Sequence, residues 1–227
     1  MSDWPFAGGT ALHKLYLAPA ARYSEDIDLV QRRPEGIGPT FNRIRERMIW
    51  LGKPRVETGE IPKLVFRFDS EGGYRRKLKI EINTHEHFAG VVDKEFNVDH
   101  RVAAGSVQIP THSINELLAT KLRAFCQRDK GRDLFDLWWA HRNAGIDEGE
   151  IVRLFMDYMH RGGDAVDSAP ELRAKLAAEQ ARGIFEDVRP LLRSGIDFRV
   201  AEALQWFEAE LIARLRNDDG TRLFARS

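Results

Sequence analysis

The sequence predicts an α/β protein of the α+β kind, with a small mixed sheet in its first half and helices in its second half. Short strand-like and helical patterns alternate in the first half, whereas the chain from about residue 112 onward has almost only amphipathic helical patterns. We therefore expect a sheet domain at 1–111 and a helical domain at 112–227. The chain has 227 residues, 43% of them hydrophobic, which is enough to bury a core.

The composition excludes several classes of protein. The 35 basic and 35 acidic residues balance, so the net charge gives no overall attraction to nucleic acid. Cys126 is the only cysteine, which excludes an internal disulfide and a zinc site built from cysteines. No apolar run approaches the roughly 18 to 20 residues of a membrane span, and the first residues lack the layout of a signal peptide. We therefore expect a cytoplasmic protein with no membrane partner.

The most informative motif joins a glycine pair to two nearby aspartates. Gly8 and Gly9 are expected to form a turn between a short strand and a helix at 10–17. Asp26 and Asp28 follow on a second strand, and residues two apart on a strand point to the same face. Two carboxylates on one face are typical ligands of Mg²⁺, so the motif indicates a site of metal-dependent nucleotidyl transfer.

The rest of the first half contains one further helix and three strand-like segments. An amphipathic helix is expected at 41–51. The segments 64–68 and 78–82 are separated by Glu71-Gly72-Gly73, which suits a hairpin turn, and 107–109 is expected to be a last short strand.

Glu81 lies on the polar face of the strand expected at 78–82. If that strand lies beside the one that carries Asp26 and Asp28, Glu81 joins them as a third carboxylate. Taken alone, however, a glutamate on the polar face of an amphipathic strand is better explained as a solvated side chain.

The helical half begins with two helices joined by a tight turn. The first, at 113–128, starts with a capping box and carries Lys121 close to its buried side. The second, at 132–140, carries Asp133 and Asp136 on one face, from which both acids can approach Lys121. A structural ion pair between the two helices is the alternative explanation. Three further helices are expected near 147–161, 170–193 and 199–216.

Taken together, four segments resemble the AbiEii/AbiGii nucleotidyltransferase-like toxins, which belong to the DNA polymerase β-like superfamily. The segments are Phe6–Leu12, Arg22–Asp28, Leu78–Thr84 and Thr120–Leu137. The resemblance implies a nucleotidyltransferase fold and transfer of a nucleoside monophosphate from an NTP to an RNA acceptor, in particular the 3′ end of tRNA. It also implies a toxin of a toxin-antitoxin or abortive infection system, with a cognate antitoxin encoded nearby.

The resemblance also implies roles for individual residues. The family's pattern places catalysis on Asp26, Asp28, Glu81, Lys121 and Asp133. It places nucleotide binding on Gly8, Gly9, Thr10, Arg22, Ser24 and Lys121. It places Mg²⁺, or Mn²⁺ in its stead, on Asp26, Asp28 and Glu81. The helical half would then complete the active site.

Two other functions stay open at this stage. One is nucleotidyl transfer to a protein or a small molecule, and the other is a catalytically degenerate protein that binds a nucleotide or a partner. Loss of Asp26, Asp28, Lys121 or Asp133 would favour the degenerate protein, and none of them is lost. The base of the donor NTP and the acceptor have no local sequence signature.

Overall fold

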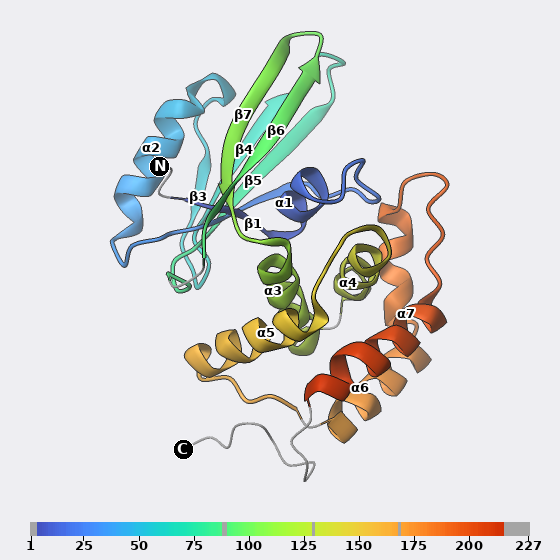
Figure 1. Ribbon diagram of the computed structural model, residues 1–227. Coiled ribbons are helices and arrows are strands. Elements are labelled where there is room, and N and C mark those ends of the chain that lie inside the picture. The colour runs from blue at the N-terminus through green and yellow to red at the C-terminus, as the bar shows by residue number, and fades with distance from the viewer. Residues whose placement is uncertain (1–3, 88–89, 129, 168, 216–227) are drawn as a thin grey trace. The chain divides into compact units, whose positions relative to one another are not determined.

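The computed structural model describes residues 4–87, 90–128, 130–167 and 169–215. The chain divides into two compact units (Figure 1). The sheet unit comprises Met1–Leu15 and Ser24–Ser113, and the helical unit comprises Tyr16–Tyr23 and Ile114–Ser227. The short segment between the first helix and the Asp26 strand therefore belongs to the helical unit.

The sheet unit is built on a mixed sheet that has seven strands among the described residues, in the order β3-β4-β5-β2-β1-β7-β6. The strands are β1 (Phe6–Ala7), β2 (Asp26–Val30), β3 (Arg55–Glu57), β4 (Lys63–Asp69), β5 (Arg75–Asn83), β6 (Val92–His100) and β7 (Ala103–Thr111). Its helices are α1 (Gly8–Leu15), α2 (Ile37–Arg47) and the short 3₁₀ helix η1 (Ile49–Leu51). The mixed α/β fold agrees with the expected fold class.

Strand register places the acidic residues of neighbouring strands side by side. β2 pairs with β5 in parallel, so that Asp26 lies opposite Lys79 and Asp28 lies opposite Glu81. β1 pairs with β2 in the antiparallel sense and places Ala7 opposite Asp28. The strand that carries Glu81 therefore lies next to the strand that carries the two aspartates, which meets the condition under which Glu81 joins them.

One face of the sheet packs against α2 and forms the core of this unit. The apolar side chains of β4 and β5 on this face pack with those of α2 and η1: Phe41, Ile44, Leu51, Leu64, Phe66, Ile80 and Ile82. Ile27 and Leu29 of β2 lie against the same cluster. Because side chains alternate along a strand, Asp26 and Asp28 project from the opposite face.

The boundaries of several elements differ from those predicted. The helix expected at 41–51 begins earlier, at Ile37, and ends at Arg47. The strand expected at 107–109 is the longer β7, and it pairs along its whole length with β6, which we did not predict. Most side chains of both strands are exposed, so the apolar alternation that identifies a half-buried strand is weak in this hairpin.

The helical unit contains α3 (Ile114–Gln127), α4 (Gly131–Asn143), α5 (Glu148–Gly162), α6 (Ala169–Ala181), the 3₁₀ segment η2 (Ile184–Leu191), α7 (Val200–Trp206), the π-helical η3 (Phe207–Leu211) and the 3₁₀ η4 (Ile212–Leu215). The helical stretch predicted at 170–193 is divided by Gly183, which has a φ of 70°. A left-handed glycine ends the helical backbone there, because other residues adopt this conformation at a higher energy. In the part of the chain that the structure describes, no helix is long and apolar enough to cross a membrane.

Candidate active site

Gly8 brings the backbone directly against the carboxylate of Asp28. Gly8 has a φ of 69°, and a Cβ added to it would lie 1.8 Å from Oδ2 of Asp28 and 2.6 Å from its Cγ. Both the left-handed backbone and this close approach require glycine. The start of α1 and the end of the Asp28 side chain are therefore in contact, with no room for a side chain between them.

Thr10 ties the first turn of α1 to the beginning of β2. Its hydroxyl donates a hydrogen bond to the carbonyl oxygen of Asp26 at 2.5 Å, and it lies 2.7 Å from the hydroxyl of Ser24. Thr10 and Ser24 thus fix the position of the helix relative to the strand that carries the aspartates. The first backbone N–H groups of a helix have no partner within the helix, so this end of α1 favours an anion.

Lys79 lies between the carboxylates of the site, a contact that the sequence analysis missed. Its Nζ is 2.8 Å from Oδ2 of Asp26 and 3.1 Å from Oε1 of Glu81. Lys63 is a second cation near Glu81, with 3.6 Å between Nζ and Oε1. The signal for Lys79 was present, because it stands two residues before Glu81 and therefore shares its face of β5.

These contacts raise the pKa of Lys79. Burial alone would lower it, but the hydrogen bonds to Asp26 and Glu81 and the charges of both carboxylates outweigh burial. Lys79 therefore remains an ammonium group that compensates the negative charge of the site.

The donor set suits a divalent cation in its chemistry. Asp26, Asp28 and Glu81 offer hard oxygen ligands on one face of two neighbouring strands, which is what Mg²⁺ prefers. Over the described residues, no three acidic, histidine or cysteine side chains converge closely enough to hold a metal ion. The ammonium group of Lys79 contacts the oxygens of both Asp26 and Glu81, so a metal held by these two residues would compete with Lys79 for them.

In the helical unit, Arg22 forms a buried, bidentate ion pair with Asp136. Nε and Nη2 of Arg22 each lie 2.6 Å from one carboxylate oxygen of Asp136. The backbone around Arg22 is held by an antiparallel bridge to Leu192, and its Nη1 donates to the carbonyl oxygen of Tyr23. Arg22 is 3% exposed and Asp136 is 0% exposed. The guanidinium is therefore buried and binds groups of the protein itself.

Lys121 lies between the two aspartates of α4. Its Nζ is 3.1 Å from Oδ1 of Asp133 and 3.2 Å from Oδ2 of Asp136. Arg128 binds Asp133 through two further hydrogen bonds. Both acids approach Lys121 across the tight turn, as the sequence predicted, and Lys121 is 7% exposed.

The cluster of Arg22, Lys121, Arg128, Asp133 and Asp136 is a network of paired charges. Burial lowers the pKa of Arg22, but the adjacent Asp136 carboxylate overcomes this effect and raises it. Each buried carboxylate has at least two cationic partners, which compensates the cost of removing it from water. The sequence analysis missed Arg128 as a partner of Asp133 and did not predict the pairing of Arg22 with Asp136.

Gly131 allows the start of α4 to approach the backbone of η2 closely. A Cβ at Gly131 would lie 2.6 Å from the Cα of Phe185 and 2.8 Å from its carbonyl oxygen. The start of α4 thus packs directly against the backbone of η2. This contact sets where Asp133 and Asp136 enter the charged cluster.

The structure divides the expected site residues between its two units. The sheet unit brings together Gly8, Gly9, Thr10, Ser24, Asp26, Asp28 and Glu81. The helical unit brings together Arg22, Lys121 and Asp133. Asp136 pairs with both Arg22 and Lys121, and Lys121 also pairs with Asp133.

A family model identifies the relatives of this chain. The model of the nucleotidyl transferase AbiEii toxin, type IV toxin-antitoxin system, matches residues 1–209. The chain belongs to this AbiEii family. The match covers both units and all the motif residues described above. Membership confirms the expected nucleotidyltransferase toxin family and supports an enzyme of this class.

The fold is similar to that of a solved nucleotidyltransferase toxin. MenT4, a nucleotidyltransferase toxin from Mycobacterium tuberculosis H37Rv, is 21% identical with a TM-score of 0.50, over 67% of this chain and 54% of MenT4. This chain therefore spans about half the length of MenT4. An antigenic nucleotidyltransferase-like protein from Paracoccidioides brasiliensis is 15% identical with a TM-score of 0.44, over 78% of this chain and 83% of that one. The comparison with curated proteins gave no match.

Proposed function

We propose that this AbiEii-family protein is a Mg²⁺-dependent nucleotidyltransferase that transfers a nucleoside monophosphate from an NTP to an RNA acceptor, the 3′ end of tRNA. The observation that carries the proposal is the contact of the Gly8 backbone with Asp28, beside Asp26 and the neighbouring Glu81. It joins an anion-binding helix end to a row of carboxylates, and nucleotidyl transfer needs both.

The chain's own residues would divide the work as follows. The N–H groups at the start of α1 bind phosphate oxygens, and Thr10 and Ser24 hold that helix end in place. Asp26, Asp28 and Glu81 would hold Mg²⁺, which supplies charge neutralisation on the triphosphate and lowers the pKa of a bound hydroxyl. Glu81 is also the candidate base for the acceptor hydroxyl, since it stands next to Asp28.

The family resemblance assigns Lys121 to the neutralisation of triphosphate charge and Asp133 to its support, and we retain both roles as proposals. The structure supports the second role within the helical unit, since Asp133 and Asp136 fix the ammonium group of Lys121. The bidentate pairing of Arg22 with Asp136 favours a supporting role for Arg22 rather than direct nucleotide binding.

We further propose that the protein acts as the toxin of a toxin-antitoxin pair, in the cytoplasm, with a cognate antitoxin encoded nearby. The type IV family to which the chain belongs supports this proposal. An inducible copy of the gene should arrest bacterial growth, and the Asp28→Asn variant should not. Growth arrest that is equal in both cases would contradict a toxic activity based on this site.

A label-transfer assay tests the chemistry. Purified protein is incubated with Mg²⁺, total bacterial tRNA and each of the four α-labelled NTPs in turn, with Asp28→Ala as control. Label on tRNA that the control lacks would support the proposal and identify the donor base. Label on protein or on a small molecule would show that the acceptor is one of these and not tRNA. If the folded protein transfers no label, a nucleotide-binding protein without activity is favoured.

A further inference from the structure

We propose that the polar face of the β4–β5 hairpin is a basic track along which the acceptor RNA strand lies. The basic track is formed by Arg67, Arg75 and Lys77. The proposal rests on the proposed function, since it identifies how that same site receives a polyanionic acceptor. It adds a binding surface outside the motif residues.

Strand register places these three cations on the same face as the carboxylates. In the β4–β5 ladder, Val65 pairs with Lys79, Arg67 with Lys77 and Asp69 with Arg75. Directly paired residues share a face, and Glu81 is on the same face two residues beyond Lys79. The opposite face carries Phe66 and Ile80, which pack against α2. The basic track and the carboxylates therefore lie on the same face of the sheet.

The cations of the basic track are available to a ligand. Arg67, Arg75 and Lys77 are all exposed, and none of the three forms an ion pair with another described residue. Lys79 and Lys63, which are nearer to the site, are both engaged with carboxylates. Asp69 lies directly opposite Arg75 on this face, so the three cations and this acid leave a net positive charge beyond the paired Lys79 and Lys63, which attracts a phosphate backbone.

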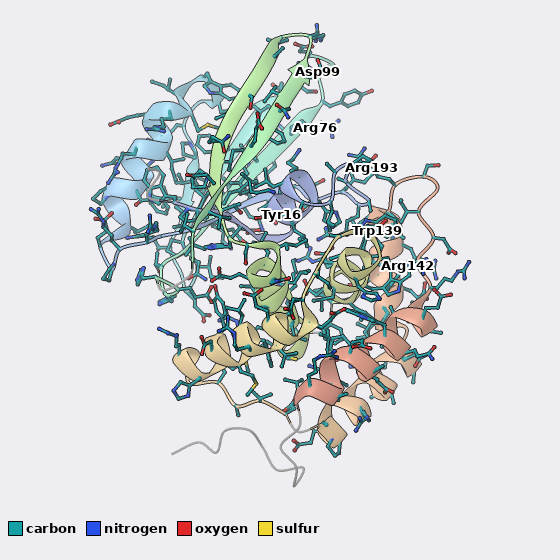
Figure 2. The ribbon with its side chains drawn as sticks, viewed as in Figure 1. Tyr16, Arg76, Asp99, Trp139, Arg142 and Arg193 are labelled. Atoms are coloured by element: carbon teal, nitrogen blue, oxygen red, sulfur yellow. The ribbon has the colours of Figure 1, made fainter. Side chains whose placement is uncertain are left out.

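The other hairpin of the sheet unit has the opposite charge. β6 carries Asp93, Glu95 and Asp99 at alternate positions, and therefore on one face. Figure 2 shows Arg76 on β5 and Asp99 near the turn between β6 and β7. The two hairpins are linked at their turns by an ion pair between Arg101 and Glu71. A polyanion is therefore favoured on β4–β5 and disfavoured on β6–β7.

The geometry of a strand also gives the acceptor a direction. Residues two apart on one strand are about 6.7 Å apart, so the distance from Glu81 to Arg75 is on the order of 20 Å. This length accommodates several nucleotides of an extended strand rather than a single phosphate. Since the reacting 3′ hydroxyl must reach the carboxylates, the preceding nucleotides extend along Lys77 and Arg67 towards the turn at Gly72 and Gly73.

The test compares matched removals of three positive charges. The track variant is Arg67→Gln, Arg75→Gln and Lys77→Gln, and the control variant is Arg45→Gln and Arg47→Gln on α2 together with Lys53→Gln after η1. A third variant, Arg67→Lys, Arg75→Lys and Lys77→Arg, keeps the charge. Binding of a fluorescently labelled single-stranded RNA is measured by anisotropy over a range of salt concentrations, with thermal unfolding and NTP binding as checks of the fold and the site.

We expect the track variant to bind RNA about tenfold more weakly, and the slope of log affinity against log salt to fall by about 2, since each lost phosphate contact removes roughly 0.7. NTP binding should be unchanged, and the control and charge-keeping variants should bind RNA like the wild type. If the track and control variants bind RNA equally while the wild type labels tRNA, the basic track is refuted and the proposed function stands. If the wild type neither labels nor binds RNA, the proposed function fails and the track with it.

Discussion

Replacement of Gly8 by alanine should damage the site far more than it damages the fold. The added Cβ would lie 1.8 Å from Oδ2 of Asp28, so the carboxylate must retreat by about 1.5 Å before it reaches an ordinary contact. A displacement of about 1 Å in a catalytic group can reduce the rate on the order of 100-fold. We therefore expect Gly8→Ala to reduce label transfer by at least this factor.

The effect on stability should be smaller, because once the Asp28 carboxylate has moved away, the main remaining cost is the left-handed backbone at position 8. A left-handed residue other than glycine costs about 1–2 kcal/mol. For a chain of this size, that corresponds to a decrease in Tm of about 2–8 °C. Differential scanning calorimetry of both proteins would measure it.

Gly163→Ala is the matched control for Gly8→Ala. Gly163 has a φ of 69° and a ψ of 18°, and a Cβ there would meet nothing within 4 Å. It should show a similar decrease in Tm and unchanged transfer, which separates backbone strain from displacement of Asp28. Transfer by Gly8→Ala within a few-fold of the wild type would refute the idea that the contact between Gly8 and Asp28 positions the site.

Three further outcomes are expected from the structure. Arg22→Met should destabilise the protein by about 3–5 kcal/mol in urea unfolding, because it removes the bidentate partner of the buried Asp136; a loss below about 1 kcal/mol would contradict a buried pair. Burial raises the pKa of the Cys126 thiol from 9.0 to about 12, so the folded protein should react with a thiol reagent at pH 8 about 1000-fold more slowly than the urea-unfolded protein; equal rates would exclude such a shift. Lys79→Met should lower the Mg²⁺ concentration for half-maximal transfer by about two- to fivefold, because a partly exposed ion pair contributes up to about 1 kcal/mol. If the variant needs a higher Mg²⁺ concentration than the wild type, Lys79 does not compete with the metal.

The sequence was sufficient to predict the placement of the acidic residues within the sheet unit. Alternation along the strand that carries Asp26 and Asp28 fixes their shared face, and the amphipathic pattern around Glu81 does the same for β5. The placement of Glu81 beside the two aspartates depended on pairing between their strands. A local sequence pattern does not show which strands are neighbours. The structure supplied that neighbour relation.

Other features could not be predicted because they depend on contacts between distant parts of the chain. The contact between Gly8 and Asp28 needs the relative position of a helix and a strand, and the pairing of Arg22 with Asp136 joins residues 114 positions apart. The β6 strand was missed for a different reason. Its hairpin is largely solvated, so its sequence lacks the strong hydrophobic period that burial imposes.

The route of the chain has a consequence for dissecting the protein. Residues 16–23 belong to the helical unit although both flanking segments belong to the sheet unit, so the backbone passes between the units three times. A fragment that starts at Ile114 would contain Asp136 but not Arg22 and would leave that buried carboxylate without its guanidinium. Expression of the helical unit alone therefore requires a circular permutation or a linker that restores 16–23, and a simple cut after Ser113 should leave the C-terminal fragment unstable.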